Sequence, residues 1–223
     1  MAVPTRTEAL RLLLSASPSP RLLRHVTVTA EVAAFLARRA RKAGLTVDRR
    51  AIETAALLHD IDKALPRDHA VVGLGHGHAG AAYVSEAGHP ELARAIAVHP
   101  VVRLTEASAD EWAQTGPLVE RLVTYADKRA TQRVVSLEKR FMRWHRKHPQ
   151  HRERLEAAHA AARRLEAVIC GDLGIKPADV ERLRWVRDAL DRAHTRGHIE
   201  LDAAMASSAA IDGGGGRGRR ASR

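Results

Sequence analysis

The chain has 223 residues, of which 45% are hydrophobic and only 3% aromatic, and its formal net charge is +11. This length allows one substantial domain with an added segment, and a core built from Ala, Leu, Val and Ile favours helices over sheets. The single cysteine, Cys170, excludes an internal disulfide and a thiolate zinc site. No apolar run approaches the roughly 20 residues that span a bilayer. We therefore expect a cytoplasmic helical protein without a signal peptide or membrane contact.

Helical periodicity dominates the first 130 residues, and no alternating strand pattern is present. The pattern predicts helices over residues 5–14 and 21–42, with Gly44 as a left-handed stop after the second. A third helix starts at the N-cap Asp48 and runs into the segment HDIDK (59–63). After a loop over 66–75, further helices are expected over 77–87, 90–98 and 117–130.

The character of the chain changes near residue 134. Helices are predicted over 134–147, 150–170 and 177–204, and residues 129–164 hold eleven Arg or Lys against three Glu. This segment is either a solvated amphipathic hairpin that packs on the first half or a face that attracts phosphate. The end, GGGGRGRRASR, is typical of disorder. We expect a helical domain over 1–135, a basic helical extension over 136–205 and a disordered basic tail over 206–223.

Polar residues interrupt several of the apolar helical patterns. His25 shares an apolar stripe with residues spaced by three and four, and the others stand at or near helix ends: His59, Asp60, His76, His78, His99 and Asp127. Any one of them is more often an ordinary core or capping residue. Together they offer imidazole and carboxylate groups without sulfur, which is the ligand set of a hydrolytic Fe, Mn, Zn or Co site.

The order of these residues resembles the HD superfamily of metal-dependent phosphohydrolases, and most closely its HDIG-type members. The segments that carry the resemblance are LLHDIDK, HGHAGA, AIAVHP and VTYADKRATQR, within residues 20–135. The resemblance implies an all-α fold, an HD-domain helical bundle, followed here by the basic extension. It does not cover the chain from residue 136 onward.

The resemblance also implies a centre with two divalent metal ions, of which Fe, Mn, Co, Zn and Mg are not distinguished. One ion would be held by His25, His59, Asp60 and Asp127, and the other by Asp60, His76 and His99. Asp60 would then bridge the two ions. His78 would either contact the substrate or contact the metal ligands without binding a metal itself. Asp62 departs from the family pattern; it would either accept a hydrogen bond that tunes the site or face solvent, and of the two we expect solvent.

The expected reaction is attack of a metal-bound hydroxide on a phosphoester or phosphoanhydride, with Asp60 and Lys63 as the catalytic residues. Lys63 would also bind the substrate phosphate. Arg133 matches the substrate-phosphate arginine of the bacterial HD-type hydrolases that split diadenosine tetraphosphate symmetrically, and Arg129 is the alternative. This similarity favours a phosphorylated small molecule as substrate, namely a dinucleoside polyphosphate or a nucleoside monophosphate.

Other functions remain open from the sequence. The absence of a GYP motif argues against a cyclic di-GMP phosphodiesterase. The lack of a synthetase domain weakens the case for an alarmone hydrolase but does not exclude it. The basic C-terminal half allows a nucleic-acid-binding protein that uses the HD core as a scaffold. A catalytically silent domain that senses a nucleotide is a third reading, and a homodimer stays open.

Overall fold

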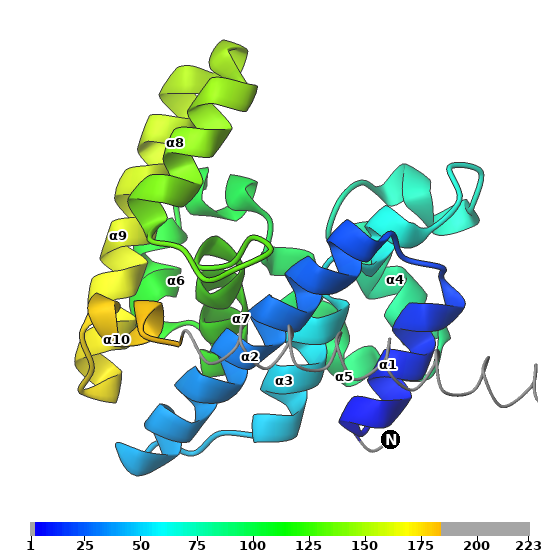
Figure 1. The fold of residues 1–223 in the computed structure, drawn as a ribbon, viewed down its shortest axis with the longest axis horizontal. Helices are drawn as coiled ribbons and strands as arrows, with labels where there is room; N and C mark the ends of the chain where they lie inside the picture. The colour runs from blue at the N-terminus through cyan, green and yellow to red at the C-terminus, as the bar shows by residue number, and fades with distance from the viewer. Residues whose placement is uncertain (1–2, 184–223) are drawn as a thin grey trace, which may run out of the picture. The chain divides into compact units, whose positions relative to one another are not determined.

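The computed structural model describes residues 3–183, which form helices joined by short turns (Figure 1). The α-helices are α1 (Arg6–Ser15), α2 (Pro20–Lys42), α3 (Arg49–Leu58), α4 (His78–Glu86), α5 (Pro90–Val98), α6 (Ala109–Thr115), α7 (Leu118–Lys128), α8 (Leu137–Lys147), α9 (Arg152–Leu173) and α10 (Pro177–Glu181). The 3-10 helices are η1 (Ile61–Ala64), η2 (Ala70–Leu74), η3 (Val101–Thr105) and η4 (Pro149–His151). Within the described residues no strand forms beyond one isolated bridge, so the predicted all-α fold is confirmed.

Side chains at the helix ends explain where the first helices begin and stop. Ser19 accepts the backbone N–H of Leu22 at 3.2 Å, and Asp48 accepts that of Ala51 at 3.0 Å. These bonds satisfy amide groups that have no partner inside the helix. Gly44, just after α2, has a φ of 82°, which is the left-handed conformation predicted for it.

The third predicted helix is shorter than expected. α3 ends at Leu58, Asp60 leaves the helical conformation with φ −108° and ψ 17°, and the chain continues as η1. The sequence pattern also missed η3 and α6, which fill residues 101–115. Of the predicted helix over 177–204, α10 covers Pro177–Glu181 and ends in a turn at residues 182–183, whereas residues 184–204 and the predicted tail lie outside the described part of the chain.

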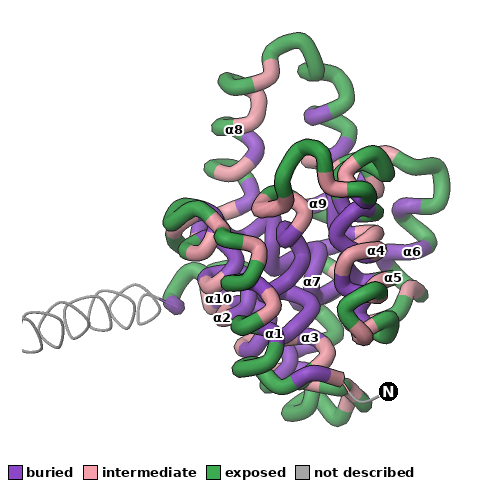
Figure 2. The backbone as a smooth tube through the Cα atoms, turned by 90° about the vertical axis from the view of Figure 1, so that its right-hand side faces the viewer, coloured by how far each residue is buried: buried purple, intermediate pink, exposed green. Residues whose placement is uncertain are grey.

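The core lies around α2 and α7. α2 packs against α3, α7 and α9, and α7 also contacts α3 and α5. Figure 2 shows the buried, purple parts of the chain gathered along these central helices, whereas the turn between α8 and α9 is exposed. Because α4 and α5 pack as a pair and α5 contacts α3 and α7, the ends of several helices meet on one side of α7.

The start of the predicted extension packs on this bundle. α9 lies beside α6, α7, α8 and η3, and α10 follows it closely in the chain (Figure 1). The predicted domain boundaries at residues 135 and 205 stay predictions, and the second lies outside the described residues. None of the helices within residues 3–183 is long and apolar enough to cross a membrane.

Candidate metal centre

The structure brings the six predicted ligands together from five parts of the bundle. His25 lies within α2, Asp127 in the last turn of α7, and the remaining four next to the ends of α3, α4 and α5. Five of the six are almost fully buried: His59, His99, Asp60, Asp127 and His25, at 0 to 7% exposure. The side chain of His76 is 39% exposed.

Four of these side chains form a first compact group. The Nε2 atom of His25 lies 3.4 Å from Asp60 Oδ2 and 3.2 Å from Asp127 Oδ1. The Nε2 atom of His59 lies 3.6 Å from each of the same two oxygens and 3.3 Å from His25 Nε2. Ligand bonds of about 2.1 Å place neighbouring ligand atoms about 3.0 to 3.4 Å apart. The spacing is therefore close to that of a metal coordination shell.

The other oxygen of Asp60 faces a second group. Asp60 Oδ1 lies 3.5 Å from His76 Nε2 and 3.4 Å from His99 Nε2. One carboxylate thus presents one oxygen to each group, which is the arrangement a bridging ligand requires. Sets of these residues, with ligand atoms within 4.8 Å of one another, include His25–His59–Asp60 and Asp60–His76–His99.

All four imidazoles are held through their Nδ1 atoms. The Nδ1 atom of His25 lies 3.2 Å from the carbonyl oxygen of Thr131, and that of His59 lies 2.7 Å from the carbonyl oxygen of Ala56. The Nδ1 atom of His99 lies 2.6 Å from the carbonyl oxygen of Ile96. The Nδ1 atom of His76 lies 2.8 Å from Asp62 Oδ2. These oxygens only accept hydrogen bonds, so each Nδ1 carries the proton. The Nε2 atom of each ring then points into the centre, as it does in metal-binding histidines.

His99 gives the clearest test of whether a metal fits. Its Nε2 atom is buried and has no hydrogen-bond partner among the described residues. Leaving such a polar atom without a partner costs about 1–3 kcal/mol. A divalent cation between His99, His76 and Asp60 would satisfy it, so the donor set fits a metal ion.

The ionisation of the centre favours binding of a cation. Burial lowers the pKa of His99 to about 4, so its ring is neutral at pH 7. Burial also acts against a charged His25, but Asp127 and Asp60 outweigh it and raise the pKa of His25 to about 9. Burial opposes ionisation of Asp60 too, yet its histidine neighbours, with His59 the strongest, hold the pKa of that carboxyl well below its usual range. Both carboxylates are therefore ionised, and without a metal ion a protonated His25 supplies part of the positive charge beside them, which a bound cation would replace.

Two basic residues that the sequence did not indicate hold Asp127. Lys128 is 1% exposed and donates to Asp127 Oδ2 at 2.6 Å and to the carbonyl oxygen of His99 at 2.7 Å. Arg140, from α8, donates to Asp127 Oδ1 at 3.2 Å. Burial lowers the pKa of Lys128, whereas the pKa of Asp127 stays well below its usual range although burial opposes this, chiefly because of Lys128. Lysine next to the last aspartate was visible in the sequence, but its burial was not.

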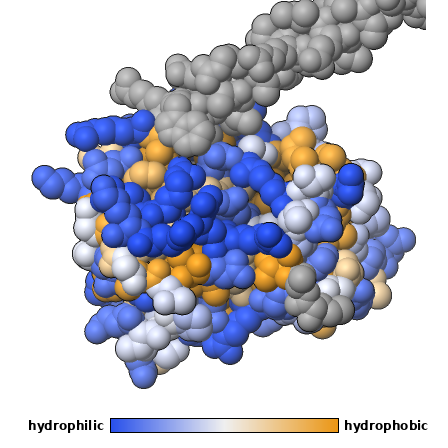
Figure 3. All heavy atoms as spheres, turned by 90° about the horizontal axis from the view of Figure 1, so that it is seen from below, coloured by the Kyte–Doolittle hydropathy of each residue, from blue (hydrophilic) through white to orange (hydrophobic). Residues whose placement is uncertain are grey.

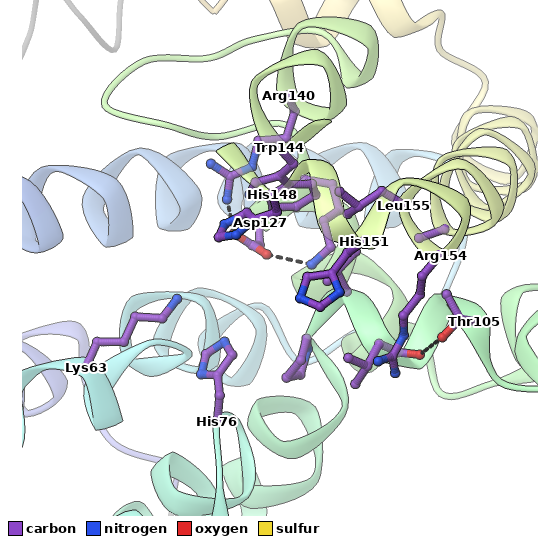
Figure 4. Close-up of a pocket in the computed structure, with 15 residues that line it drawn as sticks. Lys63, His76, Thr105, Asp127, Arg140, Trp144, His148, His151, Arg154 and Leu155 are labelled. Atoms are coloured by element: carbon purple, nitrogen blue, oxygen red, sulfur yellow. Dashed lines mark hydrogen bonds and ion pairs between the residues drawn. The ribbon is translucent and has the colours of Figure 1, made fainter. Parts of the chain in front are cut away.

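The centre opens into a cavity of about 550 Å³ (Figure 4). Lys63, His76 and Asp127 line its inner end, and Lys63 also donates to Asp60 Oδ1 at 2.7 Å. Arg140 and Trp144 come from α8, and the guanidinium of Arg140 lies 4.5 Å from the centre of the Trp144 ring. A small organic phosphate can therefore reach the centre through a basic and aromatic entrance.

Two of the predicted substrate contacts are not where they were expected. The prediction for Arg129 is wrong, because this side chain is fully buried and donates to Tyr125 Oη, Glu166 and the carbonyl oxygens of Val135 and Pro177. It therefore has no access to the cavity. Arg133 is exposed and does not line the cavity, whereas Arg140 does.

Two further expectations concern the segment around His76. His78 is exposed and lies outside the residues that line the cavity, so the structure does not bring it to the site. The expectation that Asp62 faces solvent is wrong. Its side chain is only 9% exposed and accepts the Nδ1–H of His76. The change from α-helix to η1 after Asp60 turns Asp62 towards His76.

Comparison with known families agrees with this geometry. The family model of the HD domain matches residues 22–132, which contain all six predicted ligands. This part of the chain is an HD domain, and through it the protein belongs to the HD superfamily of metal-dependent phosphohydrolases. Searches among curated proteins and among solved structures found no match. The helices α8, α9 and α10 lie beyond the matched residues.

Proposed function

We propose that the protein hydrolyses a phosphoester or phosphoanhydride of a nucleotide with two divalent metal ions at the centre. The observation that carries this proposal is the position of Asp60. Its two oxygens face two separate groups of histidine Nε2 atoms, at 3.4 to 3.6 Å. A dinucleoside polyphosphate and a nucleoside monophosphate remain the preferred substrates on the similarity of the motifs.

The bound ions would supply a water of lowered pKa and a positive charge next to the phosphoryl oxygens. The protein's own residues would do the rest. His25, His59, Asp60, His76, His99 and Asp127 would be the ligands. Lys63, whose side chain is half exposed in the cavity, would donate to a phosphoryl oxygen and stabilise the charge that develops in the transition state. Arg140 would act similarly once a metal ion competes for Asp127 Oδ1.

Nucleic-acid binding through the basic C-terminal half is the second candidate. Several basic side chains there are exposed, among them Arg143, Arg146 and Lys147. However, exposed basic residues also end α2, at Arg41 and Lys42, and Figure 3 shows hydrophilic side chains across the middle of the face seen from below. The basic residues are thus not confined to the extension, and the buried metal-type ligand set has no use in this second candidate.

Metal analysis and phosphate release test the proposal. The purified full chain should contain up to two divalent ions and release phosphate from members of a nucleotide panel. Asp60→Ala should lose at least one ion and about a hundredfold in turnover, because both groups share this carboxylate. Asp68→Ala, which removes an exposed carboxylate in the loop before η2, should behave as the wild type.

Two results would contradict the proposal. Wild-type protein that binds no metal and releases no phosphate with Mn²⁺, Fe²⁺, Co²⁺ or Mg²⁺ supplied is not a metal-dependent hydrolase. Full turnover in Asp60→Ala would mean that the reaction occurs elsewhere in the protein. Salt-sensitive oligonucleotide binding that survives Asp60→Ala, without phosphate release, would favour the second candidate.

A further inference from the structure

The wall of the cavity opposite Lys63 and His76 does not belong to the HD domain. It comes from α8, η4 and α9 and carries Arg140, Trp144, His148, His151, Arg154 and Leu155 (Figure 4). These side chains are cationic, aromatic or apolar. Among the described residues that line the cavity, the one carboxylate is Asp127, which lies at the inner end with the proposed ligands. Apart from Asp127, the described lining of the cavity is therefore basic or neutral.

The cations at the two ends of the cavity differ in how they are neutralised. At the inner end, Lys63 pairs with Asp60, and Lys128 and Arg140 pair with Asp127. At the outer end, the guanidinium of Arg154 makes no hydrogen bond or ion pair with any described residue. In Figure 4 this side chain extends from α9 towards Thr105, and His151 lines the same cavity. An uncompensated charge at a cavity mouth attracts anions.

Aliphatic side chains make up another part of the lining. Pro100, Val101 and Val102 line the cavity from η3 and the residue before it, and Leu155 and Ala158 line it from α9. Val102 is 44% exposed, although it is a large aliphatic residue. A ligand that fits this lining has an anionic group at each end and a less polar segment between them.

The outer wall is held firmly against the HD domain. The buried guanidinium of Arg129, at the end of α7, donates to Glu166 of α9 at 2.5 Å. Arg164 of α9 pairs with Asp110 of α6 at 2.7 Å. Phe141 of α8 stacks on His159 of α9, with 4.5 Å between ring centres. The first two contacts attach α9, which carries Arg154, to helices α6 and α7, and the third attaches α8 to α9.

We propose that His151 and Arg154 form a distal anion subsite, which takes a second phosphate group of the substrate on the leaving-group side. The inner end of the cavity takes the scissile phosphate, and this part of the assignment rests on the proposed function. The subsite would make the extension, rather than the HD domain, the part of the chain that selects substrates with two separated phosphate groups.

Binding of non-hydrolysable probes tests this subsite. The probes are alkane bisphosphonates of increasing chain length and the alkyl monophosphonates of the same lengths, titrated calorimetrically into the full chain with Mn²⁺. At the best length, the wild type should bind the bisphosphonate about fivefold more tightly than the monophosphonate, as expected for an exposed charge pair of about 1 kcal/mol. The preference should decrease at high salt.

Variants assign the preference to a residue. Arg154→Gln should remove the preference for bisphosphonates and leave monophosphonate affinity unchanged, and Arg154→Lys should keep part of it. The control is Arg152→Gln, which removes the same charge two residues earlier in the chain. The side chain of Arg152 is 78% exposed, pairs with Glu156 and does not line the cavity. This control should keep the full preference.

The outcomes separate the subsite from the proposed function. Equal affinity of both probe types at every length, or equal losses in Arg154→Gln and Arg152→Gln, would overturn the subsite. Because the probes are not hydrolysed, a preference that depends on Arg154 supports the subsite even where no nucleotide is cleaved. Conversely, nucleotide hydrolysis without any bisphosphonate preference would retain the proposed function and remove the subsite alone.

Discussion

His76 differs from the other three histidines of the centre in what holds it. His25, His59 and His99 donate Nδ1–H to backbone carbonyl oxygens, whereas His76 donates to the side chain of Asp62. His76 is also the exposed member of the set. The orientation of its ring in the second group therefore depends on one carboxylate.

Asp62→Ala should weaken metal binding at the second group. Without the acceptor, the His76 ring is free to rotate and its Nε2 becomes a poorer ligand, and loss of such a partner typically costs 10- to 100-fold in metal affinity. Competition with a chromophoric chelator measures this affinity, and Asp68→Ala is the control for loss of one negative charge. An unchanged affinity in Asp62→Ala would mean that Asp62 does not support metal binding through His76.

The residues that the sequence predicted and those that it missed differ in a physical way. His59 and His99 could be found because each follows an apolar helical stripe, so the stripe itself places them at the core. Asp62 was misjudged because the apolar pattern continues through residue 65, although the backbone leaves the α-helix at Asp60. Periodicity reports which face is buried, but it does not report a change from 3.6 to 3.0 residues per turn.

At the scale of helices, α7 connects the HD domain to the extension. Asp127 in its last turn faces the centre, while Arg129, two residues later, points to the opposite side and joins α9 and α10. Tyr125 donates to the same Glu166 carboxylate at 2.6 Å. Burial raises the pKa of Tyr125, so its hydroxyl keeps the proton that it donates. One helix end thus serves the site and the attachment of the extension.

Arg129→Met should lower the free energy of unfolding by about 3–5 kcal/mol, because it leaves the largely buried Glu166 without its cationic partner. Urea unfolding followed by circular dichroism measures the loss. Arg182→Met is the control, since that arginine is exposed and, among residues 3–183, forms its one ion pair with Asp179. A loss in Arg129→Met no larger than in the control would show that the buried pair contributes little to stability.

The packing of α8 and α9 explains why Arg140 and Trp144 were not predicted as site residues. Their helix reads as a charged, amphipathic segment, and nothing in its periodicity states which other helix it meets. Arg133 was chosen because its spacing from Asp127 resembles that of the substrate-phosphate arginine in the related hydrolases. In the structure, the arginine that contacts Asp127 is instead Arg140 of α8, thirteen residues further along the chain. Contacts between distant segments depend on tertiary packing and leave no local pattern.

Viewed as a whole, the described molecule concentrates ionised groups at one buried point. Asp60 and Asp127 keep pKa values well below their usual range even though burial opposes their ionisation. Without a metal ion, the negative charge of these two carboxylates is neutralised by their basic neighbours His25, Lys63, Lys128 and Arg140. The stability of the fold should therefore be linked to metal binding, apart from any catalytic activity.

Removal of metal with a chelator should lower the melting temperature. A metal at a hundred times its dissociation constant stabilises the native state by about 2.7 kcal/mol, or about 5–10 °C for a domain of this size. Differential scanning calorimetry of the metal-loaded and chelated forms measures the shift. In Asp60→Ala the difference in melting temperature between the two forms should be much smaller. An equal melting temperature of the metal-loaded and chelated wild type would refute the linkage.

The backbone anchors of His25, His59 and His99 have a consequence for how this centre can evolve. A carbonyl oxygen is present whatever the side chain, so no single substitution at Thr131, Ala56 or Ile96 deletes the acceptor. Asp62 has no such protection, because its acceptor is the side chain itself. One point mutation at position 62 would therefore impair the second ion position while the first kept all its supports. Descendants of this protein should therefore lose the second ion position before the first.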